Sequence, residues 1–252
     1  MKSRLVAGAA LLILSAANAA ADETVVMDGR FALARPLMVI PPKFPNAPLP
    51  REPVEVHVRG RLSVEGRLLD PLVTAPIGNE AYISSVSAVV ADWRFVPAIG
   101  RDCKPVEEES VLYVWFQAKD GEPSVHVSFP PERDPSSTWP RVKGATTLVR
   151  KKEPHIEYPA RLNYAGVEGI AIVVLKVART GEVVDSSLRA VSPVDEFGYP
   201  ALKGLQRISF EPFETDPPGL DAICGEYVVN YCIGYKDVRV AHPYCAAKRG
   251  NR

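Results

Sequence analysis

Apolar and polar side chains alternate between residues 54 and 64. The apolar positions of this stretch are Val54, Val56, Val58, Leu62 and Val64. A period of two is typical of a strand with one buried face, so the pattern predicts a strand over 54–64. Glu65 and Gly66 form the expected turn into a second strand at 67–73, and a third strand is expected at 111–117.

A helix is predicted between the second and third strands, over 78–93. Its apolar positions recur at helical spacing and form one stripe, which consists of Tyr82, Val86, Val89, Val90 and Trp93. Asn79 is expected to cap the first turn, because a short side-chain acceptor satisfies a free backbone N–H there.

The same landmarks recur later in the chain at an almost constant offset. The pairs 115 residues apart are Gly66 and Gly181, Asp70 and Asp185, Phe95 and Phe210, and Pro97 and Pro212, while Phe44-Pro45 and Tyr158-Pro159 lie 114 apart. This common order predicts an internal duplication. The second copy is expected to hold strands at 169–177, 182–191 and 227–235. Its helix should start near Tyr199, because Pro200 is tolerated only in a first turn.

The connections predict the order of the strands in each copy. The second strand runs back along the first, and the helix reverses the chain again, so an antiparallel sheet has the order two-one-three with the helix on one face. An Asp120-Gly121 turn signal then leads into an alternating stretch at 124–129, which predicts a fourth strand on the third. A turn at Lys236 and Asp237 leads into 238–240 in the same way. The expected fold class is therefore α+β, with two tandem small units of three or four antiparallel strands and one helix each.

These patterns divide the chain into consecutive segments. They are a signal peptide at 1–19, a proline-rich leading segment at 20–53 that is expected to be extended and mostly irregular, a first unit at 54–129, a linker at 130–153, a second unit at 154–240 and a tail at 241–252.

The first nineteen residues are typical of a cleaved secretory signal. Lys2 and Arg4 precede a short apolar run at 5–14, and an Ala-x-Ala site ends at Ala19. The alternative is an uncleaved membrane anchor, although the run is shorter than the ~20 residues that span a bilayer. We expect export to the periplasm. The formal net charge is zero and no basic stripe stands out, so nucleic acid is not an expected partner. The basic run at 150–152 is expected to be solvated.

Four cysteines, at positions 103, 224, 232 and 245, suit an oxidising compartment. They allow three pairings. Cys224 and Cys232 are too far apart to pair if they share one strand. We expect a disulfide between Cys224 and Cys245; the other interpretation is that Cys103 and Cys232 are small buried thiols.

The sequence favours binding over catalysis. No two of His57, His126, His155 and His242 have metal-ligand spacing, and neither a nucleophile motif nor a phosphate-binding glycine loop is present. We therefore expect no metal, no cofactor and no enzymatic activity. Asp70 and Asp185, which occupy equivalent places in the two copies, are expected to serve strand ends or turns.

Several short motifs resemble the C-terminal domain of TonB-family energy transducers. In the second copy they are Tyr158-Pro159, Gly166-x-x-Gly169 with the apolar run after it, and Gly181-x-Val183; in the first copy the closing Trp93-Arg94-Phe95-Val96-Pro97-Ala98 is similar. The resemblance covers roughly two-thirds of the chain that follows the signal. It implies a small periplasmic α+β domain that grips outer-membrane partners when an extended receptor segment adds to its third strand.

The resemblance implies a partner-binding edge on the third strand of each copy. Its candidate residues are Tyr227, Val228, Val229, Asn230 and Tyr231 in the second copy, and Tyr113 and Trp115 in the first. If 124–129 pairs on the third strand, the edge of the first copy is already filled.

The chain departs from the transducers in its removable signal, its two copies and its lack of a long spacer of charged repeats. The expected function is that of a soluble periplasmic module that engages an extended segment of a partner, such as an outer-membrane receptor or another envelope protein. One alternative is a structural or self-associating envelope protein with capped sheet edges, for example a homodimer. A second alternative is an anchored transducer whose N-terminal segment is not cleaved.

Overall fold

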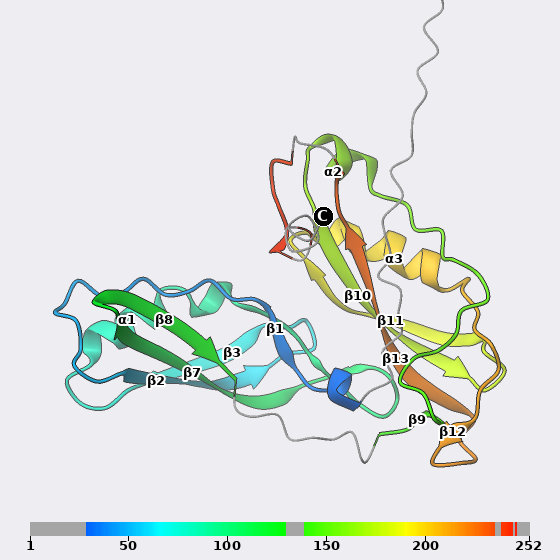
Figure 1. The fold of residues 1–252 in the computed structure, drawn as a ribbon, viewed down its shortest axis with the longest axis horizontal. Helices are drawn as coiled ribbons and strands as arrows, with labels where there is room; N and C mark the ends of the chain where they lie inside the picture. Colours follow the sequence, from blue (N-terminus) through cyan, green and yellow to red (C-terminus); the bar gives the residue numbers. More distant parts are fainter. Residues whose placement is uncertain (1–28, 130–138, 235–237, 244, 246–252) are drawn as a thin grey trace, which may run out of the picture.

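The computed structural model describes residues 29–129, 139–234, 238–243 and 245. The predicted signal peptide, the turn at Lys236 and Asp237, and most of the tail lie outside these residues. The fold is α+β with mostly antiparallel sheets. The two larger sheets belong to two units, and the second unit lies to the right of the first in Figure 1.

The first unit holds a four-stranded sheet in the order β3-β2-β7-β8. Its strands are β2 (Val54–Leu62), β3 (Leu68–Thr74), β7 (Glu108–Lys119) and β8 (Glu122–Ser128). The order two-one-three and the added fourth strand that the sequence predicts are both confirmed. Alternate residues of β2 and β7 are buried with Tyr82, Val86, Val90 and Trp93 of the helical segment.

The helix of the first unit is shorter than the predicted 78–93. α1 (Glu80–Ser87) is followed by the 3-10 turn η2 (Val90–Asp92). Three valines at 86, 89 and 90 weaken the helix, because β-branched side chains lose χ1 freedom there. The side chain of Asn79 does not cap the helix as predicted, since its Nδ2 donates to the carbonyl of Pro76 at 3.1 Å.

The second unit holds a three-stranded sheet in the order β11-β10-β13. Its elements are α2 (Ala160–Tyr164), β10 (Gly169–Ala178), β11 (Val183–Ser192), η3 (Asp195–Phe197), α3 (Gly198–Leu205) and β13 (Ala222–Tyr231). α3 packs on one face, where Phe197, Ala201 and Leu205 are buried. Pro200 lies in the first turn of α3, as predicted.

The predicted fourth strand of the second unit is wrong. The chain at 238–240 does not pair with β13. Val240 instead forms a parallel bridge with Val167, and its amide and that of Arg239 both donate to the carbonyl of Gly166. The reason is that a buried carboxylate, Glu168, accepts from the amides of Ile233 and His242 and draws the C-terminal chain over the start of β10.

Both segments that precede the units contribute short strands. β1 (Arg35–Met38), within the predicted irregular segment, pairs with β4 (Arg94–Val96), and β9 (Arg141–Val142) pairs with β12 (Thr215–Asp216). The remaining short elements are η1 (Gly29–Ala32), β5 (Ala98–Ile99) and β6 (Pro105–Val106).

The repeated glycines make the same contact in both units. Gly66 and Gly181 lie in the hairpin turns with φ of 73° and 88°, and the amides of Phe95 and Phe210 donate to their carbonyls. A Cβ at Gly66 would lie 2.0 Å from the carbonyl oxygen of Phe95, and one at Gly181 would lie 1.9 Å from that of Phe210. Only glycine fits because the closing segment lies directly on each turn.

An aromatic trio also recurs at the repeat offset. Phe44, Tyr82 and Phe116 contact one another in the first core, and the equivalent second trio consists of Tyr158, Phe197 and Tyr231. The hydroxyls of the second trio are used internally: Tyr158 donates to the carbonyl of Val167 at 2.7 Å, and Tyr231 donates to that of Phe197 at 3.0 Å. Burial raises the pKa of both tyrosines far above its ordinary value.

Candidate functional site

The third-strand edge of the first unit is occupied. β8 pairs along β7, so that Tyr113 lies opposite Ser128 and Trp115 opposite His126. The predicted edge at Tyr113 and Trp115 is therefore not free, because the Asp120-Gly121 turn folds the chain back onto it. The side chains of both residues are half-buried on the face of the sheet away from α1.

The third-strand edge of the second unit is buried. Tyr227, Val229 and Tyr231 point into the core beneath α3 with no exposed surface, and Asn230 is 1% exposed. Of the five predicted residues in β13, Val228 alone is partly exposed. No strand among the described residues pairs on the outer side of β13, yet its residues offer almost no accessible surface for an added strand.

β11 is an edge strand of the second sheet, and residues at its end line a groove. The groove has a volume of about 820 Å³ and lies between the second sheet and the first unit. One wall is the end of β11 and the turn after it, residues 188–196. The opposite wall comes from β1, from the hairpin turn of the first unit and from β4, through Met38, Val64, Glu65, Arg67 and Arg94.

The groove combines exposed apolar side chains with both signs of charge. Met38 is 37% exposed and Val64 is 39% exposed. Arg94 is held in place because its Nη1 donates to the carbonyls of Ala91 and Trp93 at 3.0 and 2.8 Å. Glu196, on the opposite wall, accepts from Arg161. The groove can therefore accept an extended chain with apolar and polar side chains.

A β-bulge aims one charged side chain of β11 at the first unit. Ile172 of β10 lies opposite Ala190 and Val173 lies opposite Leu188, so Arg189 is the extra residue. Strict alternation would turn Arg189 into the apolar core beneath α3. The bulge re-aims it to the other face.

Arg189 binds the first unit through main-chain carbonyls. Its Nε donates to Pro97 at 2.7 Å, its Nη2 donates to Leu33 at 2.9 Å, and its Nη1 donates to Phe31. Its side chain has no exposed surface. One buried side chain thus holds the leading segment and the closing segment of the first unit against the second sheet.

Glu226 of β13 neutralises the buried cation. Its carboxylate accepts from Arg189 and from Arg35 of β1, and its side chain is 5% exposed. Burial lowers the pKa of Arg189 to about 10, and the charge of Glu226 opposes this shift. Burial also raises the pKa of nearby Glu108, against the effects of the Ala34 amide and of Arg189. Such a buried ion pair adds little net stability, because the cost of desolvating both charges offsets their attraction.

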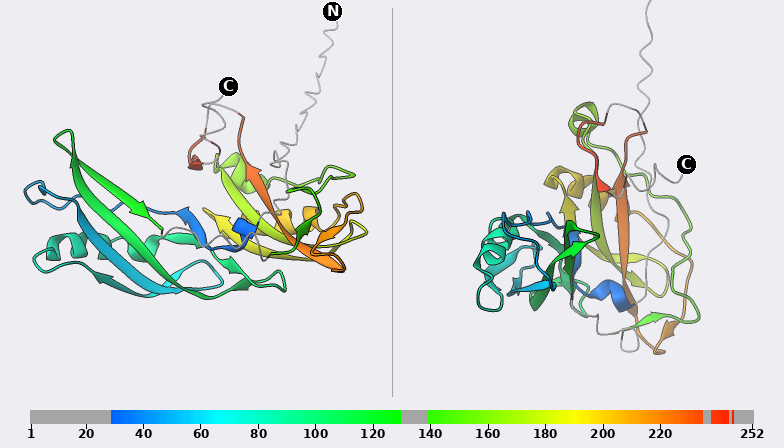
Figure 2. Two further views of the ribbon diagram at one scale, coloured as in Figure 1. Left: turned by 60° about the horizontal axis from the view of Figure 1, so that its bottom comes forward. Right: turned by 60° about the vertical axis from the view of Figure 1, so that its left-hand side comes forward.

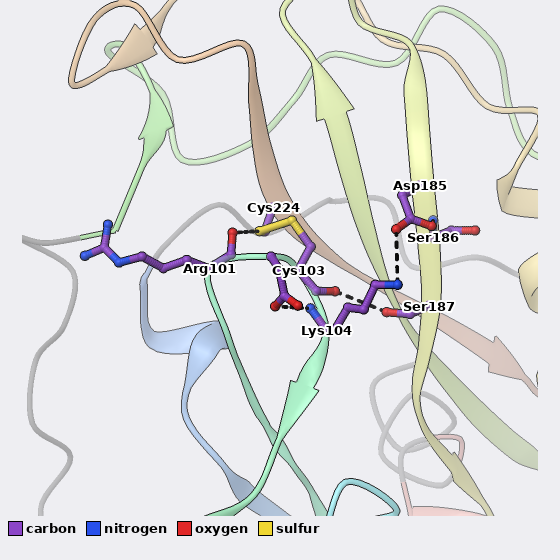
Figure 3. The surroundings of a disulfide bond; sticks show 8 residues. Arg101, Cys103, Lys104, Asp185, Ser186, Ser187 and Cys224 are labelled. Atoms are coloured by element: carbon purple, nitrogen blue, oxygen red, sulfur yellow. Dashed lines mark hydrogen bonds and ion pairs between the residues drawn. A yellow bond between two sulfur atoms is a disulfide. The ribbon is translucent and has the colours of Figure 1, made fainter.

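A disulfide joins the two units beside this ion pair. Cys103, in the turn between β5 and β6, pairs with Cys224 of β13, and the two lie 121 residues apart (Figure 3). The Oγ of Ser187 donates to the carbonyl of Cys103 at 3.2 Å, and Lys104 lies 3.8 Å from the carboxylate of Asp185. The repeated Asp185 thus serves the contact between units.

The predicted pairing of Cys224 with Cys245 is wrong. Cys245 pairs with Cys232, 13 residues earlier, and the described residues contain no free cysteine. Cys245 lies at the end of β13, where its Sγ is 3.6 Å from the carbonyl of Tyr231, whereas Cys224 lies near the start of the same strand and beyond disulfide reach. The sequence does not reveal the Cys103–Cys224 pairing, because that disulfide depends on how the two units dock.

Apolar contacts complete the junction. Phe31, Ile99 and Cys103 of the first half pack with Val174 and Cys224, and Val96 packs with Ile170 and Ile172. In both views of Figure 2, η1 lies beside the second sheet. α3 therefore covers one face of the second sheet, and the first unit covers part of the other face. These contacts fix the positions of the two groove walls relative to each other.

The chain matches no known protein-family model, no curated protein and no solved structure. None of the helices in the described part of the chain has the length and apolar character needed to cross a membrane.

Sequence reasoning missed the β11 edge and the Arg189–Glu226 contact. One signal was available. Residues 170–175 of β10 are apolar without interruption, and such runs are typical of strands buried on both faces. The run indicates that something covers the second face of the sheet, although it does not identify the first unit as the cover.

Proposed function

We propose that the protein binds an extended segment of another polypeptide as an added strand along the outer edge of β11. The observation that carries this proposal is the groove of about 820 Å³ that has the end of β11 in one wall and Met38 and Val64 in the other. An added strand satisfies unpaired main-chain groups, and the groove walls select its side chains.

β11 suits this role better than the other accessible edges. β3 contains Pro71 and β8 contains Pro123, and proline on an edge removes a hydrogen-bond donor that a guest strand would need. β11 has no proline over Val183–Ser192. Residues 188–192 line the groove, and because Arg189 is the extra residue of the bulge they span roughly 13 Å, which matches about four residues of a guest.

The same proposal includes a TonB-like ancestry for both units and a place in the periplasm. The shared hairpin glycines, closing phenylalanines and aromatic trios support the duplication, and two disulfides support an oxidising compartment. The expected partner is an outer-membrane receptor or another envelope protein with an exposed extended segment. The binding edge differs from the third-strand edge that the family resemblance implies.

The test uses a peptide selected on the purified protein from a random library, and variants of the opposite groove wall. Met38→Asp and Val64→Asp place a charge where the guest's apolar side chains would lie, and each should weaken binding about tenfold. Leu72→Asp on β3 is the matched control, since Leu72 is 59% exposed and lies outside the groove. Equal affinity of all three variants for the peptide would refute the assignment to this groove.

A further inference from the structure

A second, smaller pocket lies on the far side of the second unit, next to α3. It has a volume of about 270 Å³. Its walls are the chain at 152–157, which leads into α2, and the residues from Pro200 to Arg207. Figure 1 shows this stretch of chain running past α3. The peptide groove does not share any residue with this pocket.

The two walls lie close together because residue 204 is a glycine. A Cβ at Gly204 would lie 2.7 Å from Cγ1 of Ile156 and 2.8 Å from the carbonyl oxygen of His155. Ile156 is buried in the core, whereas the adjacent His155 is exposed at the pocket. The polar side chains on both sides are thus brought to the rim of one small pocket.

The pocket has an excess of positive charge. Lys152, Lys203 and Arg207 line it and are exposed, and none of them forms an ion pair within the described part of the chain. Of the two lining carboxylates, Glu153 is already engaged by Arg150, whose Nη1 lies 2.7 Å from it. Glu157 is therefore the one remaining lining carboxylate, and it faces the charges of Lys152, Lys203 and Arg207.

We propose that this pocket binds a phosphate monoester whose attached group is small and polar. Two lysines and an arginine suit a compact dianion: lysine acts as a mobile point charge, and the arginine guanidinium can donate two parallel hydrogen bonds to phosphate oxygens. The volume admits a phosphate with only a short attached group. The ligand is either a free phosphate ester or the headgroup of a phosphatidic-acid type of lipid.

The first arm of the test measures binding of glycerol 3-phosphate to the full chain by NMR titration of backbone amides. We expect shifts at residues 152–157 and 200–207. We also expect affinity to fall about fivefold in Lys203→Gln, to fall further in Lys203→Gln/Arg207→Gln, and to fall with added salt. Lys119→Gln removes an exposed lysine far from the pocket and should bind as the unaltered protein does.

The second arm of the test distinguishes a lipid headgroup from a free phosphate ester. Vesicles made of equal parts phosphatidylcholine and phosphatidic acid are compared with pure phosphatidylcholine in sedimentation. Co-sedimentation that the double variant loses would assign a lipid headgroup, whereas binding of the soluble ester without co-sedimentation would assign a free ligand. The proposal is overturned if neither probe binds, or if binding survives in the double variant.

Discussion

Single residues at special backbone positions determine how each unit closes. Gly66 and Gly181 have positive φ, and a carbonyl of the closing segment lies where their Cβ would be. Gly219 has nearly the same φ as Gly181, at 89°, but no atom lies within 4 Å of the position that a Cβ would take there. Substitution of Gly219 should therefore cost stability through backbone strain alone, whereas substitution of Gly66 or Gly181 should add the cost of a steric clash.

Gly181→Ala is expected to destabilise the protein more than Gly219→Ala. Both substitutions carry the left-handed strain of about 1 kcal/mol. Gly181→Ala also displaces the segment at Phe210. It should therefore lower the free energy of unfolding by at least about 2 kcal/mol more than Gly219→Ala does. Urea unfolding of the two variants measures the difference. Equal losses would show that the closing segment does not lie on the turn.

A buried histidine near the C-terminus makes stability depend on pH. Burial lowers the pKa of His242, and the charge of Glu168 only partly opposes this shift. The folded state therefore binds a proton less readily than the unfolded chain, whose imidazole titrates near pH 6.5. Stability contributed by neutral His242 is present above that pH and is lost as the pH falls below it.

The melting temperature should fall between pH 7.5 and pH 5.5 in the unaltered protein and fall less in His242→Gln. The glutamine side chain cannot be protonated in this range, so it removes the linkage. His155→Gln is the matched control, since His155 is exposed, and it should keep the full pH dependence. Parallel curves for all three proteins would contradict the assignment.

At the scale of elements, β10 is the strand on which both halves of the chain pack. Its odd-numbered residues, such as Val173, lie beneath α3, and its even-numbered residues, such as Ile172, contact the first unit. An isolated two-layer unit would leave the even-numbered face in water. The structure instead buries Ile172 to 1% exposure.

Ile172→Ala should cost about 2–5 kcal/mol of unfolding free energy, because it leaves a cavity between the units. Val184→Ala on β11 is the control for a solvent-facing strand position, at 56% exposure, and should change stability by less than about 0.5 kcal/mol. Denaturant unfolding compares the two. A loss at Ile172 no larger than at Val184 would mean that the first unit does not cover this face.

The sequence predicts elements better than contacts between them. Alternation at 54–64 and 124–129 predicts two strands, and chain reversal predicts their places in the sheet. β1 is missed because prolines suppress alternation in the leading segment. The bulge at Arg189 is missed because an extra residue leaves no mark in a composition pattern, and the disulfide partners depend on docking.

The sequence predicts the kind of site, a strand edge, but not which strand provides it. A free strand edge in a tandem of sheets is a reasonable expectation from the repeat, but its location is not. The turn at Asp120 and Gly121 fills one expected edge, and burial removes the other. The groove at β11 exists only because both units form its walls, and no local pattern encodes that arrangement.

At the scale of the whole molecule, three kinds of contact make the two units one body. They are the disulfide Cys103–Cys224, the buried Arg189–Glu226 pair with Arg35, and the apolar contacts of β10. The groove needs this junction, because its two walls belong to different units. Binding should therefore depend on residues that never touch the guest.

Cys103→Ala/Cys224→Ala combined with Glu226→Gln should uncouple the units. The disulfide closes a long loop and contributes about 4–5 kcal/mol through chain entropy, and Glu226→Gln leaves two arginines without their carboxylate. Calorimetry should show one transition in the unaltered protein and two in the triple variant. Cys232→Ala/Cys245→Ala, which opens a short loop within the second unit, should lower the melting temperature and keep a single transition.

The central claim, that a guest strand adds to β11, is tested most directly by hydrogen exchange of backbone amides with and without a saturating selected peptide. The account predicts slower exchange on binding at residues 188–192 of β11, with the edges of β3 and β8 unchanged. Peptide binding that protects β3 or β8 and leaves β11 unchanged would contradict it.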